Sequence, residues 1–262
     1  MLSTIHNLAD GASIAAGLRN FLVSQTPDKH LSITLIDADD LKNGAIHELA
    51  DTFLNEPEKR QLETFTFEKR RYQWLLGRVC AKRSVLNLID PPGEPPRFSP
   101  LDITIAVAAD GRPIAALRST TKLHPLPGIS ISHSGRKIVA LAANALCGID
   151  IQLLTDTLFK VRDRFCSDKE STMLHEATND ELPQLGMLWS AKESVKKCLG
   201  EFTTIGFLAM ELTRIEHHQS CAFLELQLNR SCPGVDSVTV VASVEDGYCL
   251  SACIVPKAPD HA

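Results

Sequence analysis

The chain has 262 residues, of which 44% are hydrophobic and 23% are charged, and its formal net charge is -5. These values are typical of a soluble globular protein with one large or two small domains. The negative balance argues against a nucleic-acid binder, whose surface is usually basic. We expect no membrane span, because the longest apolar stretch, near residues 138–147, is too short.

Eight cysteines are scattered through apolar or helical contexts, and no C-x-x-C pair occurs. This pattern favours reduced, mostly buried thiols and therefore a cytoplasmic protein. Residues 1–30 lack the continuous apolar run of a signal peptide, and we interpret them as an N-terminal extension. Because four apolar residues recur there at helical spacing, we expect a short amphipathic helix. They are Ile14, Leu18, Phe21 and Leu22.

The first half of the chain mixes extended and helical patterns. It predicts strands at residues 31–37 and 101–107, a helix that begins after Asn55, a longer helix at 68–88, a proline-rich loop at 90–100 and a turn at 110–113. Asn55 followed three residues later by Glu58 is typical of a capped helix start. The three acids just after the first strand, at 37, 39 and 40, favour a solvated turn over a metal site.

Basic side chains recur along the predicted helix 68–88. Arg71, Arg78 and Lys82 are spaced by seven and four residues, so a helix would place them on one face. Such a stripe is either a solvated face or a wall for a polyanionic cofactor. Lys59, on the preceding helix, is a weaker candidate for the same role.

The second half of the chain repeats this mixture. It predicts a hairpin at 129–132 and 137–143, an extended segment at 148–152, a helix capped by Ser167, a main helix at 188–199 and strands at 208–213, 222–228, 235–244 and 248–255. Strands and helices do not alternate strictly, so the fold class is α+β.

Three short stretches carry the chemistry, namely Ile129-Ser-Ile-Ser-His-Ser-Gly135, Gly148-Ile-Asp-Ile-Gln152 and Trp189-Ser-Ala-Lys-Glu-Ser-Val-Lys-Lys197. In the second stretch, strand alternation places Asp150 and Gln152 on one face. In the third, Glu193 and Lys197 are four residues apart, so a helix presents both on one side. Oxygen ligands beside an ammonium suit a hard cation and a phosphate.

These stretches, in this order, resemble the 4'-phosphopantetheinyl transferases, specifically the two-lobed Sfp type. The family pattern is a turn like S-H-S-G, then G-[IV]-D-x-E, then W-x-x-K-E-[SA]-x-x-K, and Gly111-Arg-Pro113 matches a fourth motif, G-[KR]-P. The resemblance runs from about residue 33 to the C-terminus. It implies two similar α+β lobes, a pseudo-dimer with the active site in the cleft between them. We expect the lobes at 31–145 and 146–262.

The resemblance also implies an activity, the Mg²⁺-dependent transfer of 4'-phosphopantetheine from coenzyme A to a serine of an acyl or peptidyl carrier protein. Asp150 and Glu193, with Gln152, would hold the metal; Glu193 would be the general base, and Lys197 would stabilise the departing 3',5'-ADP. The residues implied to bind coenzyme A are Arg112, Ser132, His133, Lys192, Arg71, Arg78, Lys82 and Lys59. The expected partners are coenzyme A and the carrier protein, without nucleic acid or membrane, and the expected state is a monomer.

Gln152 departs from the family pattern, which often has a second carboxylate there. Two alternatives stay open, and Gln152 supports the first of them. One is a binding module for the carrier protein or coenzyme A that has lost turnover. The other is a different Mg²⁺-dependent phosphoryl enzyme, such as a nucleotide hydrolase.

Overall fold

The computed structural model describes residues 18–20, 22–23, 30–41, 45–90, 96–117, 127–177, 180–200, 206–218, 221–232 and 234–255. The chain forms two compact units that divide between Asn144 and Ala145. Among the described residues, no helix is long and apolar enough to cross a membrane.

Part of the predicted N-terminal helix is present. Residues 18–20 and 22–23 are helical, and Leu18 and Leu22 are buried, at 0% and 3% exposure. These residues belong to the second unit, although in sequence they precede residues 29–144 of the first unit. The expected helix residues Ile14 and Phe21 lie outside the described part of the chain.

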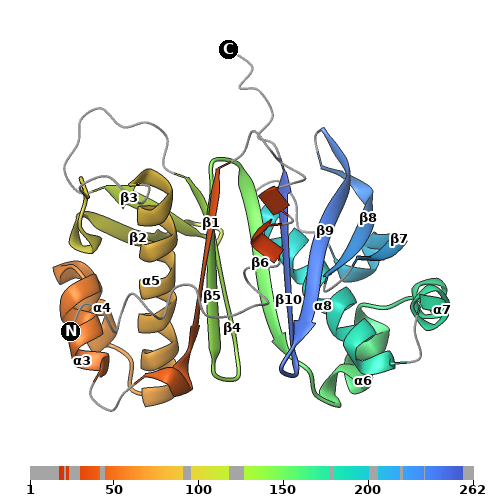
Figure 1. The fold of residues 1–262 in the computed structure, drawn as a ribbon, viewed down its shortest axis with the longest axis horizontal. Coiled ribbons are helices and arrows are strands. Elements are labelled where there is room, and N and C mark those ends of the chain that lie inside the picture. The colour runs from red at the N-terminus through yellow and green to blue at the C-terminus, as the bar shows by residue number, and fades with distance from the viewer. Residues whose placement is uncertain are drawn as a thin grey trace. The chain divides into compact units, whose positions relative to one another are not determined.

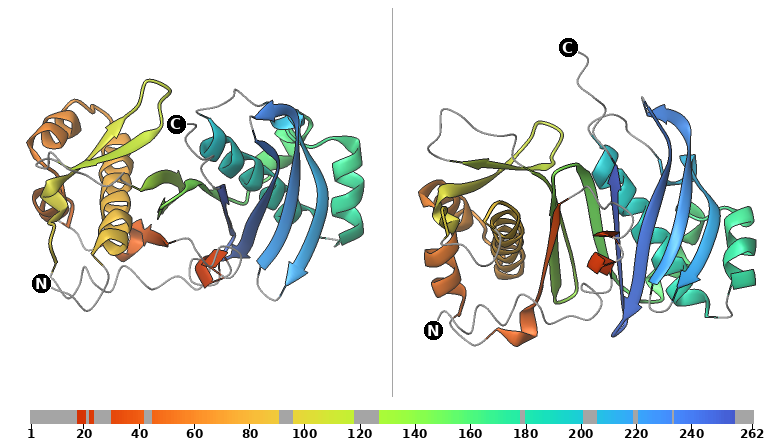
Figure 2. Two further views of the ribbon diagram at one scale, coloured as in Figure 1. Left: turned by 90° about the horizontal axis from the view of Figure 1, so that it is seen from above. Right: turned by 45° about the horizontal axis from the view of Figure 1, so that its top comes forward.

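The first unit contains a small antiparallel sheet, a separate hairpin and several helices (Figure 1). Its elements are β1 (Leu31–Asp37), α3 (Ala45–Phe53), α4 (Glu56–Glu63), α5 (Glu68–Ile89), β2 (Ile103–Val107), β3 (Pro113–Leu117), β4 (Gly128–Ser134) and β5 (Lys137–Ala143), with short 3-10 turns at Ala38–Asp40 and Pro100–Asp102. The sheet has the order β1-β5-β4, and β2 pairs with β3. Helix α5 covers one face of the sheet, and their apolar side chains form the core (Figure 2).

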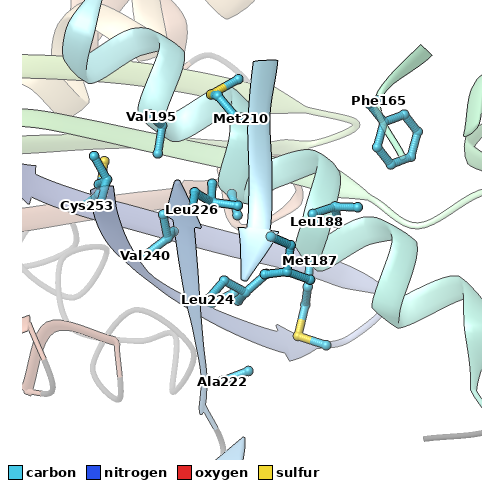
Figure 3. Close-up of a cluster of buried hydrophobic side chains, with 14 of the residues drawn as sticks. Phe165, Met187, Leu188, Val195, Met210, Ala222, Leu224, Leu226, Val240 and Cys253 are labelled. Atoms are coloured by element: carbon cyan, nitrogen blue, oxygen red, sulfur yellow. The ribbon is translucent and has the colours of Figure 1, made fainter. Parts of the chain in front are cut away.

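The second unit has a larger sheet packed against one long helix. Its elements are β6 (Leu146–Leu153), α6 (Thr157–Val161), α7 (Asp168–Ala177), α8 (Glu181–Leu199), β7 (Met210–His218), β8 (Cys221–Cys232), β9 (Val235–Glu245) and β10 (Tyr248–Val255), with 3-10 turns at Arg162–Arg164 and Phe207–Ala209. All neighbouring strands are antiparallel, in the order β6-β10-β9-β8-β7. Figure 3 shows Leu224, Leu226 and Val240 of the sheet beside Leu188 and Val195 of α8.

The α+β class is confirmed, and most of the predicted elements are present with shifted ends. Helix α8 begins at Glu181 rather than at residue 188, because Pro183 occupies the first turn, where a missing N–H is tolerated. Strand β7 begins at Met210, since residues 207–209 form a 3-10 turn. Strand β3 was not predicted; its alternation is short and begins with a proline.

Candidate active site

Strand β6 and helix α8 bring the main candidate residues together within the second unit. A side chain at Gly148 would meet the Ser194 carbonyl oxygen at 1.8 Å, so only glycine lets α8 lie this close to β6. Two residues further along β6, Asp150 therefore lies beside α8. The hydroxyl of Ser190 donates to the Asp150 carbonyl oxygen, at 3.2 Å, and fixes the strand to the helix.

The Asp150 carboxylate is nearly buried and forms an ion pair. Lys197 donates from Nζ to Asp150 Oδ1 at 2.7 Å and to the carbonyl oxygen of Ile149 at 3.2 Å. Asp150 is 6% exposed, whereas the Lys197 side chain is 29% exposed. The carboxylate is thus almost enclosed, and it is paired with an ammonium whose side chain is more exposed to solvent.

Glu193 lies one helical turn before Lys197, on α8. Burial raises the pKa of the Glu193 carboxyl, and the negative charge of Asp150 raises it further, while Lys197 and Lys196 act in the opposite direction. Because the two carboxylate charges repel each other, a bound cation would remove an unfavourable electrostatic free energy that is present in the metal-free protein. A carboxyl group with a raised pKa is also better suited to accept a proton near neutral pH.

Gln152 continues the line of Asp150 along β6. In the pairing with β10, Asp150 is opposite Ser251 and Gln152 is opposite Cys249, so the two side chains share one face of the sheet. The Gln152 amide nitrogen donates to the Leu153 carbonyl oxygen at 2.8 Å. That bond orients the half-buried side chain at the end of the strand.

The donor set of Asp150, Glu193 and Gln152 fits Mg²⁺. No group of three or more His, Cys, Asp or Glu side chains forms a metal centre in the described part of the chain. Mg²⁺, however, is commonly bound by one or two carboxylates together with substrate phosphates, and it keeps several waters. Two carboxylates whose negative charges repel each other match this mode better than a closed protein cage.

Lys192 does not have the expected position, and its assignment to phosphate oxygens is wrong. Its side chain is 0% exposed, and Nζ binds Glu170 Oε1 at 2.6 Å and the Phe165 carbonyl oxygen at 2.7 Å. Burial lowers the pKa of the Lys192 ammonium, an effect that the Glu170 carboxylate opposes. An ammonium enclosed in this way does not reach an external phosphate.

The basic stripe of α5 requires the same correction at one position. Lys82 is 0% exposed and binds Glu58 Oε2 and the Phe53 carbonyl oxygen, so its ammonium does not face solvent. Arg78 is 8% exposed and stacks over the Trp74 ring, with Cζ 4.4 Å from the centroid. In the described part of the chain, the buried Nε atoms of Arg71 and Arg78 have no hydrogen-bond acceptor.

The remaining cofactor candidates lie on the surface of the first unit or close to it. Lys59 is paired with Asp51 at 2.8 Å. Arg112 follows the turn residue Asp110 and donates from Nε to its carboxylate at 2.6 Å, which lowers the pKa of Asp110. On β4, Ser132 is buried and His133 is exposed.

Part of the chain is similar to one family of known proteins. Residues 146–253, which include β6 and α8, match the model of the 4'-phosphopantetheinyl transferase superfamily. The 4'-phosphopantetheinyl transferase gsp of Aneurinibacillus migulanus is 25% identical over 134 residues, or 51% of this chain and 50% of that protein. The 4'-phosphopantetheinyl transferase psf-1 of Bacillus pumilus is 24% identical over 237 residues, or 89% of this chain and 93% of that protein.

The second unit of the chain is therefore similar to the 4'-phosphopantetheinyl transferase superfamily.

Two solved structures are also similar to parts of the chain. The holo-(acyl-carrier-protein) synthase of Thermotoga maritima has 22% identity and a TM-score of 0.36, over 52% of this chain and 74% of that chain. An ACPS–CoA complex of Chronobacterium ammoniagenes has 18% identity and a TM-score of 0.34, over 44% of this chain and 95% of that chain.

Sequence reasoning found the two helix caps but missed the second function of their glutamates. Ser167 and Glu170 form the predicted reciprocal cap, and Asn55 and Glu58 form another. In the structure, each glutamate also binds a buried lysine. The available signal was spacing: Lys82 follows Leu75 by seven residues and Val79 by three, so a helix places it beside apolar side chains, where a charge requires a buried partner.

Proposed function

We propose that this protein transfers 4'-phosphopantetheine from coenzyme A to a serine of an acyl or peptidyl carrier protein and releases 3',5'-ADP. The observation that supports the proposal most strongly is the arrangement of Asp150, Glu193 and Lys197 on β6 and α8. It combines two mutually repelling carboxylates with one ammonium, in the segment that matches the superfamily model. We further propose that Asp150 and Glu193 hold Mg²⁺, with Gln152 beside them.

Bound Mg²⁺ supplies neutralisation of the diphosphate charge in such a site. Glu193 would accept the proton of the carrier serine, directly or through a water molecule. Its raised pKa makes the carboxylate a stronger base than an ordinary glutamate. The serine oxygen then forms a bond to the phosphorus that carries pantetheine, and the bond from this phosphorus to 3',5'-ADP breaks. Lys197 would stabilise the negative charge that develops on the departing oxygen.

In the first unit, we propose contacts to coenzyme A from Arg112, Ser132, His133, Arg71 and Arg78. The buried donors of the two α5 arginines support an anionic ligand, because a buried unpaired N–H costs free energy that a phosphate oxygen would recover. Lys59 is a weaker candidate, since its ammonium already binds Asp51. Lys82 and Lys192 are excluded from the proposed contacts because they are enclosed with glutamates.

We propose a cytoplasmic monomer. The seven cysteines whose side chains the structure describes are buried and free, in keeping with a reducing compartment. Burial raises the pKa of the Cys166 thiol to about 11, which keeps it protonated.

Intact-protein mass spectrometry tests the proposed activity. An apo carrier protein is incubated with this protein, coenzyme A and Mg²⁺, and the carrier should gain the mass of one phosphopantetheine. Hydrolysis of coenzyme A without a change in the carrier would support a hydrolase instead. Binding of coenzyme A or carrier with no chemical change would support a non-catalytic module.

A further inference from the structure

The buried lysine of α8 belongs to a small network that joins three elements. Lys192 binds Glu170 and the carbonyl oxygen of Phe165. Glu170 in turn accepts from the backbone N–H of Ser167 at 2.8 Å, closing the cap of α7, and from the N–H of Leu212 on β7, also at 2.8 Å. The carboxylate therefore ties α8, the start of α7 and β7 to one point.

The first unit contains the same network. Lys82 of α5 binds Glu58 and the carbonyl oxygen of Phe53. Glu58 accepts from the backbone N–H of Asn55 at 3.1 Å, closing the cap of α4, and from the N–H of Ile105 on β2 at 3.0 Å. In both units the phenylalanine precedes the cap residue by two positions, and the glutamate follows it by three.

The helices that carry the two lysines share a local sequence as well. Ala81-Lys-Arg-Ser-Val85 on α5 corresponds to Ala191-Lys-Glu-Ser-Val195 on α8. The one difference within these five residues is at the position after the lysine, where α5 has Arg83 and α8 has Glu193. The network is thus a repeated element of the fold, and only the second copy stands next to a proposed catalytic carboxylate.

A buried ion pair is a costly way to stabilise a fold, because both charges lose their hydration. Its best-attested benefit is to select one arrangement of packed elements over its neighbours. Successive residues on a helix are about 100° apart around the axis. Fixing Lys192 toward Glu170 and Phe165 therefore also fixes the direction of Glu193 and the turn that leads to Lys197.

We propose that the Glu170–Lys192 pair is a positioning device that sets the rotation of α8, and so holds Glu193 beside Asp150. The proposal rests on the proposed function, because it assigns the pair a role in the transfer reaction. Because the Lys192 and Glu170 side chains are only 0% and 2% exposed, the proposal gives neither of them a contact with the substrate. The Glu58–Lys82 pair joins the corresponding elements of the first unit, but the residue after its lysine is Arg83 and not a proposed catalytic carboxylate. It therefore provides a matched control.

The test compares Glu170→Gln with Glu58→Gln, which remove the same charge from the same network in the two units. Both variants should lower the thermal unfolding midpoint by similar amounts. At a temperature where both are folded, Glu170→Gln should lower kcat by about 10- to 100-fold, as expected for a small displacement of a catalytic group. Its KM for coenzyme A should change by less than about twofold, because Lys192 does not contact the cofactor. Glu58→Gln should retain kcat within about twofold.

Equal effects of the two variants on kcat would overturn the positioning role and leave a purely structural one. A rise in KM for coenzyme A with unchanged kcat in Glu170→Gln would also overturn it. If Glu170→Gln does not fold, the double variant Glu170→Gln/Lys192→Met leaves no buried unpaired charge and should recover stability. The proposal predicts that its kcat stays low, and recovery of kcat together with stability would contradict it.

Backbone hydrogen exchange separates this proposal from the proposed function. Amides of residues 189–197 should exchange faster in Glu170→Gln than in the wild type or in Glu58→Gln, under native conditions. This result does not depend on turnover. If the wild type transfers nothing but the exchange difference is present, the proposed function fails and the positioning device stands. Unchanged exchange over these residues would contradict the device, whatever the activity.

Discussion

Lys197 on α8 donates a hydrogen bond to the Asp150 carboxylate on β6 across 2.7 Å, within the second unit. The pair brings one end of the long helix to the edge strand of the sheet. Glu193, one turn earlier on the same helix, experiences both charges, since Asp150 raises its pKa and Lys197 lowers it. The three side chains therefore form one electrostatic unit.

Replacement of Lys197 tests the proposed role of its ammonium. Lys197→Met should lower kcat by roughly 10- to 100-fold, the value of one charge-assisted hydrogen bond in the transition state. Lys196→Met is the matched control, because Lys196 is exposed and its ammonium lies 4.6 Å from the Phe207 ring centroid. Steady-state transfer to an apo carrier measures both, and a similar loss in the two variants would remove Lys197 from the reaction.

Gln152 tests the metal assignment. Gln152→Glu adds an anionic oxygen beside Asp150, so half-saturation should occur at a lower Mg²⁺ concentration than in the wild type. Turnover need not rise, because tighter ground-state binding does not lower the barrier. Mg²⁺ titrations at fixed coenzyme A compare the wild type, Gln152→Glu and Gln152→Ala. Three superimposable curves would mean that residue 152 does not face the cation.

Arg112 is predicted to recognise the 3'-phosphate of coenzyme A. In Arg112→Ala, the affinity for coenzyme A should fall by roughly 10- to 100-fold, as for a charge-assisted contact. Dephospho-coenzyme A, which lacks this phosphate, should bind almost as well as it does to the wild type. Calorimetric titration with both ligands makes the comparison, and equal losses would place Arg112 away from the 3'-phosphate.

Glu193 should make the free protein less stable near neutral pH. The pKa of Glu193 in the folded state is raised above its ordinary value of 4.5. At a pH between 4.5 and this raised pKa, the folded protein therefore binds more protons than the unfolded chain. The contribution of the neutral Glu193 carboxyl to the free energy of unfolding is therefore fully present below pH 4.5. It is lost as the pH rises through the folded-state pKa. Glu193→Gln should accordingly raise the unfolding midpoint near neutral pH, without divalent cations, and by less in acid.

Glu176→Gln, an exposed change on α7, is the control for this pH series and should show no such gain. A Glu193→Gln midpoint that equals the wild type across the whole pH range would contradict the repulsion between Glu193 and Asp150.

The sequence predicted the class of the fold and the position of most strands, because alternation and turn residues are local signals. It missed the first two turns of α8, where Pro183 and Gly186 resemble a loop. Gly186 is required for packing instead, since a side chain there would meet Leu154 at 2.1 Å. Local patterns do not contain this kind of contact.

The proposed catalytic residues could be named from the motifs that carry the family resemblance, but the direction of each lysine on a helix could not. Lys192 adjoins Glu193 in the motif, but its side chain is fully enclosed, because Glu170 provides a buried partner from another helix. Lys82 is enclosed for the same reason, because Glu58 comes from another helix. A partner brought by tertiary packing decides whether a charged side chain is buried or exposed.

The stoichiometry of the reaction tests the central claim most directly. Carrier mass and released 3',5'-ADP are measured in the same reaction for the wild type, Asp150→Ala and Glu193→Ala, with unfolding curves to confirm that the variants are folded. We predict one phosphopantetheine added for each 3',5'-ADP released by the wild type, and no transfer by either folded variant. Release of 3',5'-ADP without modification of the carrier, or transfer at the wild-type rate by either variant, would contradict the proposed function or the proposed site.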